Sequence, residues 1–375
     1  MSRVELLGEL HGLLPSVELY PTALNAEAVL THHTLLTTNH YFYVRNHDKE
    51  YPRLNRETYK LSVTGAVNNP LEIDYKELFG LPRHSKTMTL ECAGNGRFLI
   101  PYSKDRIRSS EWWGTNAVST ARWSGVLLSD VLGNAELRDG ASVIRLIGAD
   151  QVEVDGIKQP YAGHIPVDLL KEREVMLAYE MNGSELPVEH GFPLRDVVPG
   201  WYAMRNVKWL TRIEVLTEDQ ARVVKDEDIV QGKRYYIIGE DGEITVLTEM
   251  KPKSITTSAL YDGRNLTLRG YAWSGDSRDI KGVEISADQG DTWQRAKLDH
   301  TGGPYEWRLW SFDDIDVSGQ NTFEIFSRAL GTDGRGFIPL QPEFTELDAE
   351  HNPFGYINNG WRSHGVKITV LKTTS

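Results

Sequence analysis

The chain has 375 residues, of which 40% are hydrophobic, and it is long enough to form two hydrophobic cores. Its formal net charge of −12 excludes a broad basic surface of the kind that binds nucleic acid. Its single cysteine excludes an internal disulfide and any metal cage built from several cysteines. A site for an anion must therefore be a local cluster of arginine or lysine.

The N-terminal sequence, MSRVELLGELHGLLPSVELYP, mixes acidic residues with apolar ones and does not match a secretory signal. No run of about 18 apolar residues occurs, so we expect no membrane-spanning helix. These features predict a cytoplasmic protein without a membrane partner. A periplasmic location stays open if a leader precedes this sequence.

Up to about residue 250, short strand and helix patterns alternate without a regular βαβ period, which predicts an α+β domain. Leu61 and Val63 alternate in a predicted strand. The segment PLEIDYKELFGLP predicts a short helix that ends at Gly80 and Pro82.

The segment SGVLLSDVLGNA predicts a second helix, which starts at Ser124 and stops at Gly133. Two further strands are predicted over residues 142–150 and 174–183, the second ending in an Asn-Gly turn.

Beyond residue 250 the pattern changes to short alternating strands separated by Gly, Asp and Asn turns. About 120 residues of this kind predict a β-sandwich of immunoglobulin-like size. We therefore expect two domains, 1–250 and 251–375. The predicted sandwich strands lie within 265–275, 282–298, 305–312, 321–330 and 365–371.

The one cysteine, Cys92, stands in the stretch TLECAGNGR, before a glycine-rich turn and Arg97. Positive charge and backbone amides favour a thiolate, which can ligate a metal or act as a nucleophile. A nucleophile would need a base, for which His190 or His47 is available. A third interpretation is a buried cysteine that only packs.

The stretch NHYFYVRNH places Arg45 and His47 two positions apart, on one face of an extended segment. Arginine binds oxyanions in a bidentate manner, and histidine can add a donor. A zinc site from His32, His33, His40 and His47 is not favoured, because the spacings match no standard motif.

Residues 189–215 hold several cations among apolar residues: His190, Arg195, Arg205, Lys208 and Arg212. Buried cations need anionic partners, which an anionic cofactor would supply. The alternative is a solvated basic face.

The motifs ECAGNGR, YFYVRNH, LAYEMNG followed by HGFPLR, and VVPGWYAMRNVKW together resemble the sulfite oxidase family of molybdopterin enzymes, in the same order along almost the whole chain. The resemblance implies a molybdopterin-binding domain followed by an immunoglobulin-like dimerisation domain. It implies that Cys92 ligates molybdenum and that Arg45 and Arg97 line an oxyanion pocket. Cofactor contacts are implied for Phe42, Tyr43, Val44, Arg45, Asn46, His47, Cys92, Asp150, His190, Arg195, Asn206, Val207 and Lys208.

The resemblance also implies a pocket tyrosine that assists electron and proton transfer, and this is Tyr235, with Tyr236 as the competing register. Two positions depart from the family pattern. Phe354 stands where many members carry a substrate-pocket arginine, and Gly96 stands where many carry another. Both changes leave the implied pocket less positive.

The implied activity is oxidation of sulfite to sulfate at a molybdenum centre, with electrons passed to an external cytochrome-like protein or to oxygen. A homodimer is implied, and no haem is expected on this chain, which lacks a C-x-x-C-H motif. Reduction of nitrate or of an organic S- or N-oxide on the same fold stays open. So do a metal-free cysteine-nucleophile enzyme and a non-enzymatic binding module.

Overall fold

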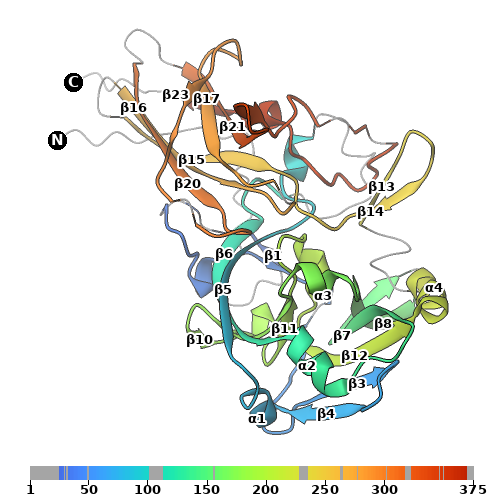
Figure 1. Ribbon diagram of the computed structural model, residues 1–375. Helices are drawn as coiled ribbons and strands as arrows, with labels where there is room; N and C mark the ends of the chain where they lie inside the picture. The colour runs from blue at the N-terminus through green and yellow to red at the C-terminus, as the bar shows by residue number, and fades with distance from the viewer. Residues whose placement is uncertain are drawn as a thin grey trace.

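The computed structural model describes residues 25–28, 30, 33–48, 50–100, 113–154, 157–227, 235–261, 265–276, 278–300, 302–316, 322–345, 347–348 and 350–369. Two units are visible in Figure 1. The N-terminal unit carries β1 to β12 and the helices α1 to α4, and the sandwich carries β15 to β23. The arrangement is the predicted α+β class.

Two five-stranded sheets form the N-terminal unit. One has the order β10-β9-β6-β5 with β11 on β9, and the other has the order β4-β3-β12-β7-β8, in which only β12 and β3 run parallel. The strands are β1 Asn25–Ala26, β2 Val44–Arg45, β3 Lys60–Gly65, β4 Leu71–Asp74, β5 His84–Glu91, β6 Val118–Leu127, β7 Ala141–Val154, β8 Ile157–Pro166, β9 Met176–Met181, β10 Ser184–Glu185, β11 Arg195–Val197 and β12 Leu210–Thr217.

Three predicted strands are confirmed in this unit. Leu61 and Val63 of β3 are fully buried, as their alternation indicates. The predicted strand 142–150 lies within the longer β7, and 174–183 contains β9. The helices are short: α1 Tyr75–Leu78, α2 Leu128–Ala135, α3 Leu169–Glu172 and α4 Glu218–Glu227.

The helix predicted for PLEIDYKELFGLP is wrong in its first half. Residues Leu71–Asp74 are strand β4, because they pair with β3 across the sheet edge. The helical part begins only at Tyr75, where Asp74 and Glu77 form a reciprocal capping box.

The predicted start of the second helix at Ser124 is also wrong. Strand β6 continues to Leu127 because it pairs with β5 on one side and β9 on the other. The hydroxyl of Ser124 lies 2.7 Å from that of Ser85 on β5. Helix α2 then begins at Leu128 and runs through Gly133.

The sandwich consists of the sheets β15-β16-β20-β19 and β18-β17-β21-β22, with β23 on β21. Leu268, Val283 and Ile325 are among the residues of its own buried core. Its strands are β15 Lys253–Tyr261, β16 Asn265–Trp273, β17 Gly282–Ser286, β18 Gln294–Arg295, β19 Lys297–Leu298, β20 Arg308–Asp316, β21 Thr322–Thr332, β22 Phe337–Pro339 and β23 Val366–Thr369; the hairpin β13 Tyr236–Ile238 and β14 Ile244–Val246 precedes it.

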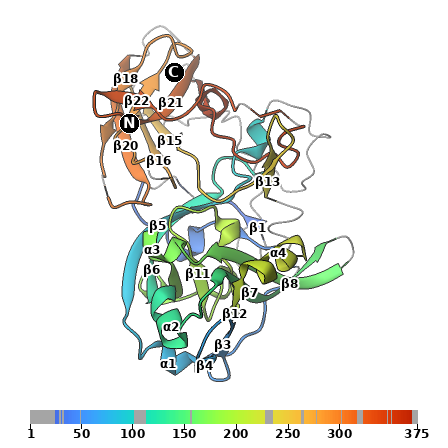
Figure 2. The same cartoon turned by 45° about the vertical axis from the view of Figure 1, so that its right-hand side comes forward.

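The larger hydrophobic core continues from the N-terminal unit into the sandwich. Trp273 and Trp307 belong to this core, and the Trp307 ring stacks on Tyr271 with ring centroids 4.0 Å apart. The indole nitrogen of Trp307 donates to the carbonyl of Leu35 at 2.8 Å. Figure 2 shows the two units meeting above β5 and β6, so the contact between them is buried and specific.

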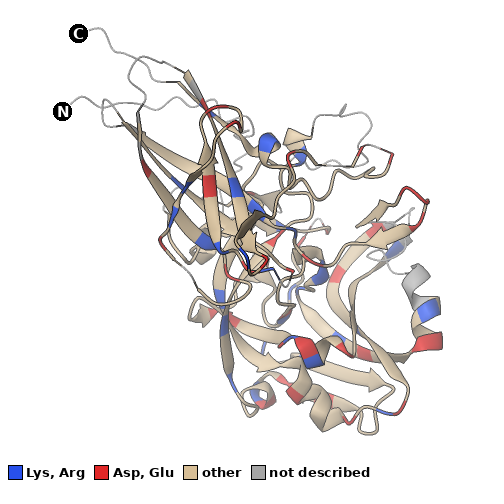
Figure 3. Ribbon diagram, turned by 45° about the horizontal axis from the view of Figure 1, so that its top comes forward, with Lys and Arg blue, Asp and Glu red and all other residues tan. Residues whose placement is uncertain are grey.

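Acidic and basic residues are interspersed over both units in the view of Figure 3. Within the described ranges, no helix is both long and apolar enough to cross a membrane.

Candidate active site

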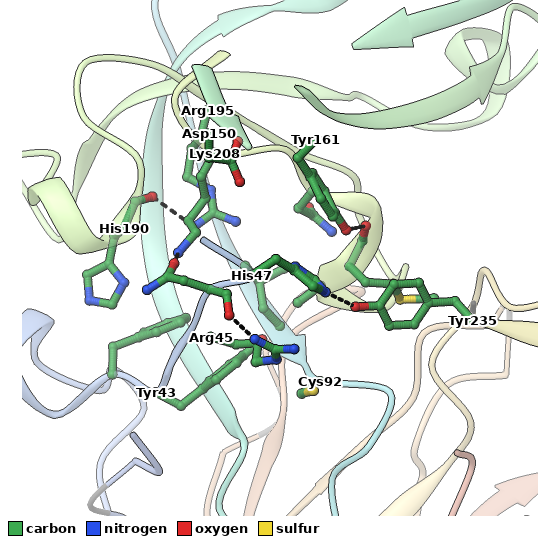
Figure 4. A pocket seen from close by; sticks show the side chains of 16 residues that line it. Tyr43, Arg45, His47, Cys92, Asp150, Tyr161, His190, Arg195, Lys208 and Tyr235 are labelled. Carbon is green, nitrogen blue, oxygen red and sulfur yellow. Dashed lines mark hydrogen bonds between the residues drawn. The ribbon is translucent and has the colours of Figure 1, made fainter. Parts of the chain in front are cut away.

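A cavity with about 650 Å³ of space lies in the N-terminal unit. Its walls come from segments far apart in the sequence, which the two sheets bring together (Figure 4). The lining residues are Phe42, Tyr43, Arg45, Asn46, His47, Leu90, Cys92, Asp150, Tyr161, His190, Arg195, Ala203, Met204, Asn206, Lys208 and Tyr235.

Cys92 follows the last residue of β5, and its half-buried thiol opens on this cavity. Its backbone nitrogen donates to the carbonyl of Ala117 at 2.9 Å, and its carbonyl accepts from the nitrogen of Asn95 at 2.9 Å. Burial raises the pKa of the Cys92 thiol, while Arg97 and Arg45 oppose the rise. A thiol in this setting is not activated by its surroundings alone, and a bound metal ion would remove its proton.

The turn after Cys92 depends on its glycines. A Cβ on Gly94 would lie 2.3 Å from Nη2 of Arg97, so only glycine lets the guanidinium fold against the turn. Gly96 has a φ of 81°, and a Cβ there would lie 2.8 Å from Nδ2 of Asn358. At position 96 the chain therefore has no room for a larger side chain without rearrangement.

Three cations surround the cavity together with one carboxylate. Arg195 donates from Nη1 to the carbonyl of His190 at 3.0 Å, and Lys208 donates to the Asn46 side chain and to the carbonyl of Glu189. Arg45 donates to the carbonyl of Asn46. These acceptors are neutral groups, so the hydrogen bonds to them do not cancel the positive charge of the three side chains.

The pKa values of these cations reflect their burial. Burial lowers the pKa of Arg195 to about 10, and it lowers the pKa of Lys208 well below its usual value. Burial, with Lys208 and Arg195 nearby, lowers the pKa of His190 to about 3, so its imidazole is neutral. An anion in the cavity would stabilise the charged forms of Arg195 and Lys208.

Asp150 of β7 supplies the carboxylate. Its Oδ1 is buried and has no hydrogen-bond partner among the described residues. Burial raises the pKa of Asp150 to about 7, against the nearby charge of Lys208. An orphaned acceptor at the wall of a cavity fits a ligand that carries N–H donors.

Tyr235, and not Tyr236, lines the cavity. Its hydroxyl lies 2.5 Å from Nε2 of His47, whose ring stacks on Tyr161 with ring centroids 5.0 Å apart. Tyr236 instead packs edge-on against Phe354. Of the two tyrosines, Tyr235 is therefore the one that lies beside the cavity.

Three of the residues expected at the site do not line the cavity. Val44 and Val207 are buried, and Val207 donates its backbone nitrogen to Asp196 at 2.6 Å. Arg97 is also buried, donates from Nε to the carbonyl of Phe354 at 2.8 Å, and lies over the ring of Tyr356. It acts on Cys92 by charge from outside the wall.

Four lining residues were missed from the sequence: Leu90, Tyr161, Ala203 and Met204. Leu90 could have been found, because it lies two positions before Cys92, and side chains two apart in an extended segment share one face. Ala203 and Met204 lie inside the motif VVPGWYAMRNVKW. Tyr161 has no local signal, since it reaches the cavity through the pairing of β8 with β7.

Other cations and histidines considered from the sequence lie elsewhere. Arg205 is buried and donates from Nε to the carbonyl of Leu247, while Arg212 is exposed on β12. His33 contacts Asp299, and His32 lies outside the described residues. Among the described residues, no three His, Cys, Asp or Glu side chains gather at a metal-binding distance.

Comparison with known proteins identifies the two units. Residues 48–224 match the family described as "Oxidoreductase molybdopterin binding domain", and residues 243–370 match "Mo-co oxidoreductase dimerisation domain". The crystal structure of the sulfane dehydrogenase SoxCD from Paracoccus pantotrophus has the same fold, with a TM-score of 0.72 and 24% identity over 96% of this chain and 90% of that chain.

Several curated relatives are similar over most of the chain. Human mitochondrial sulfite oxidase is 36% identical over 355 residues, which are 89% of this chain and 62% of the human protein. Chicken sulfite oxidase is 35% identical over 82% of this chain and 69% of its own length. Nitrate reductase [NADH] 1 of Arabidopsis thaliana is 34% identical over 77% of this chain and 35% of its own length. The chain thus spans about 62% of the length of the human relative.

The residues around the cavity fit a molybdopterin. A cysteine thiolate is a soft ligand that suits a redox metal, and Cys92 presents its sulfur to the cavity. Arg45, Arg195 and Lys208 suit an anionic group, and the orphaned oxygen of Asp150 suits an N–H donor. With the two family matches and the chicken relative, these features show that the chain belongs to the sulfite oxidase family of molybdopterin-dependent oxidoreductases.

Proposed function

We propose that this protein oxidises sulfite to sulfate at a molybdenum cofactor bound in the cavity. The observation that carries the proposal is that the one cysteine of the chain opens on a cavity walled by Arg45, Arg195 and Lys208. Sulfite is an oxyanion, and this local positive field offsets the net charge of −12.

Different residues of the cavity would bind the metal, the cofactor and the substrate. Cys92 would hold the metal, while Arg195, Lys208 and neutral His190 would hold the anionic part of the cofactor. Arg45 would orient the substrate oxyanion. When bound, the cofactor supplies two-electron oxygen-atom transfer; sulfite and water give sulfate, two protons and two electrons.

Tyr235 and His47 would accept and transfer a proton released in this reaction. The phenol and the imidazole are already joined at 2.5 Å beside the cavity, so a proton can pass between them without a large movement. The electrons would pass to an external acceptor, a cytochrome-like protein or oxygen.

The test is elemental analysis for molybdenum on protein from a host that makes the cofactor, with sulfite oxidation measured by steady-state kinetics. We expect about one molybdenum per chain, loss of the metal in Cys92→Ser, and turnover of sulfite. Metal-free protein would contradict the proposal, and activity without molybdenum would favour a cysteine nucleophile instead.

A second candidate is reduction of nitrate or of an organic S- or N-oxide on the same site. Phe354 stands at the position where the family pattern implies an arginine. It stacks on Tyr356, which stacks on the cavity residue Tyr235, so an aromatic cluster adjoins the cavity there. Fewer cations weaken binding of a dianion more than that of nitrate or a neutral oxide. Assays with these oxidants and a reduced dye distinguish the two candidates: turnover of an oxidant without turnover of sulfite would support this one.

We also infer a homodimer formed through the sandwich, which matches a dimerisation domain by family. Light scattering after gel filtration should give about twice the chain mass of 42.4 kDa. A mass equal to one chain at micromolar concentration would contradict this inference.

A further inference from the structure

Glu91 is a buried carboxylate directly before the cysteine of the cavity, and its side chain is fully covered. Its Oε1 accepts from Nζ of Lys253 at 2.6 Å and from Nδ2 of Asn95 at 3.0 Å. Its Oε2 accepts from the indole nitrogen of Trp273 at 2.9 Å. Lys253 and Trp273 belong to β15 and β16, so two of these three donors come from the sandwich.

The alternation of side chains along β5 explains this arrangement. Leu90 and Cys92 line the cavity, and Glu91 between them points to the opposite side. Figure 1 shows β5 rising through the N-terminal unit toward the sandwich. The end of one strand therefore contacts the cavity with one face and the second unit with the other.

Asn95 ties this ion pair to the peptide of Cys92. The nitrogen of Asn95 donates to the carbonyl of Cys92 at 2.9 Å, and its Oδ1 accepts from the nitrogen of Ala117 at 3.0 Å. Ala117 in turn accepts from the nitrogen of Cys92 at 2.9 Å. Lys253 also lies 3.4 Å from the carbonyl of Asn95. Asn95, which contacts both Glu91 and Lys253, thus holds the carbonyl of Cys92 directly. It holds the nitrogen of Cys92 indirectly, through Ala117.

The charges of the pair also bear on the sulfur. Both side chains are shielded from water, with 2% of Lys253 and none of Glu91 exposed, so each charge is compensated chiefly by the other. Glu91 is the residue directly before Cys92, so a net charge on the pair would act on the sulfur from a short distance. Removal of either partner would leave one full charge next to the cysteine, in a medium that screens it weakly.

We propose that Lys253 is a positioning residue for the metal site: through Glu91, the sandwich fixes the Cys92 peptide and balances the charge beside its sulfur. This inference rests on the proposed function, because it takes Cys92 as the ligand of the metal. It gives the second unit a role in setting the reduction potential of the metal, in addition to any role in assembly.

The test is a redox titration of molybdenum, followed by electron paramagnetic resonance, on the full chain. Lys253→Met leaves the negative charge of Glu91 uncompensated, which favours the oxidised metal and lowers the potential. Glu91→Gln keeps the shape and leaves the positive charge of Lys253, which raises the potential. The double variant should return close to the unsubstituted value. The control Arg328→Met breaks the pair with Glu284 inside the sandwich and should cause no shift.

Shifts of opposite sign in the two single variants are the result that a merely structural role would not produce. Shifts of the same sign, no shift in metal-loaded protein, or an equal shift in the control would overturn the inference. Each single variant has its own expected direction of shift in the reduction potential, so one variant still tests the inference if the other fails to fold.

If the unsubstituted protein holds no molybdenum, the proposed function fails, and the inference is then tested on the metal-free chain. Cys92 is the only cysteine, so its alkylation by iodoacetamide at one pH reports on this thiol alone. Alkylation should be slower in Lys253→Met and faster in Glu91→Gln than in the unsubstituted protein. Equal rates in all three proteins would overturn the charge coupling.

Discussion

The hydroxyl of Tyr235 and Nε2 of His47 lie 2.5 Å apart, which joins the segment before β13 to the segment after β2 at the cavity. Tyr235→Phe removes this hydrogen bond and keeps the ring. Because a positioned acid or base contributes at least about 100-fold, we expect kcat to fall about 100-fold with molybdenum content unchanged. Steady-state kinetics of Tyr235→Phe and the control Tyr236→Phe test this. An unchanged kcat in Tyr235→Phe would remove the pair from the mechanism.

Arg195 is a cation of the cavity wall that the proposal assigns to the anionic cofactor. Arg195→Gln should therefore lower cofactor affinity about 10- to 100-fold, since a charged hydrogen bond to a buried anion is worth about 1.5–3 kcal/mol. Molybdenum and pterin content of purified protein measure this. The control Arg212→Gln changes an exposed arginine of β12, and it should retain the cofactor. Equal retention in both variants would speak against an anion at Arg195.

Asp150 should make the stability of the metal-free protein depend on pH. Its pKa is raised by burial to about 7, whereas an aspartate in an unfolded chain has a pKa of about 3.9. The folded state therefore holds more protons between these values, and the contribution of Asp150 to the free energy of unfolding falls as the pH rises from about 4 to 7.

Asp150→Asn removes this titration. Between pH 5 and pH 7 the variant should gain about 2 kcal/mol in unfolding free energy relative to the unsubstituted protein, as measured by urea unfolding. Titrating groups that do not interact with Asp150 are present in both proteins, so their effects cancel in the difference. A difference that does not change with pH would show that Asp150 ionises normally.

The ion pair of Glu91 and Lys253 should also matter for stability. Lys253→Met leaves a buried carboxylate without its counter-charge, which costs about 3–5 kcal/mol. The matched control is Lys86→Met on β5, the strand that carries Glu91. Lys86 pairs with the largely exposed Glu174, so its loss should cost less than about 1 kcal/mol. Urea unfolding of the metal-free proteins compares them. Similar losses in the two variants would mean that the buried pair contributes little.

Gly94 is required by the close approach of Arg97. Gly94→Ala would place a Cβ 2.3 Å from the guanidinium, so we expect the turn after Cys92 to shift and molybdenum content to fall severalfold. Gly133→Ala is the control, since a Cβ there meets nothing within 4 Å and alanine stabilises a helix by about 1 kcal/mol over glycine. Full metal content in Gly94→Ala would show that the turn tolerates the shift.

The sequence predicts best what is encoded locally. The segment around Arg45 and the turn around Cys92 are short motifs, and the structure brings both to one cavity. The local pattern at 71–74 favours a helix, but pairing with β3 makes this segment a strand. Ser124 likewise has the local pattern of a helix start, but pairing with β5 and β9 keeps it in a strand.

Contacts across long sequence separations could not be predicted in this way. Tyr161 reaches the cavity only through the pairing of β8 with β7. Glu91 and Lys253 are 162 positions apart, and each alone looks like an ordinary charged residue near a strand end. Their contact depends on how the two units pack, which no local pattern records.

The shared end of β5 has a consequence for protein engineering. A chimera that joined the first 250 residues to a foreign β-sandwich would bring a carboxylate to the junction without the ammonium and indole that meet it in this chain. In such a chimera the foreign sandwich would need a lysine and a tryptophan at the positions of Lys253 and Trp273 to hold Glu91, and through it Cys92, in place. The two halves are therefore not interchangeable modules, even though each matches a family of its own.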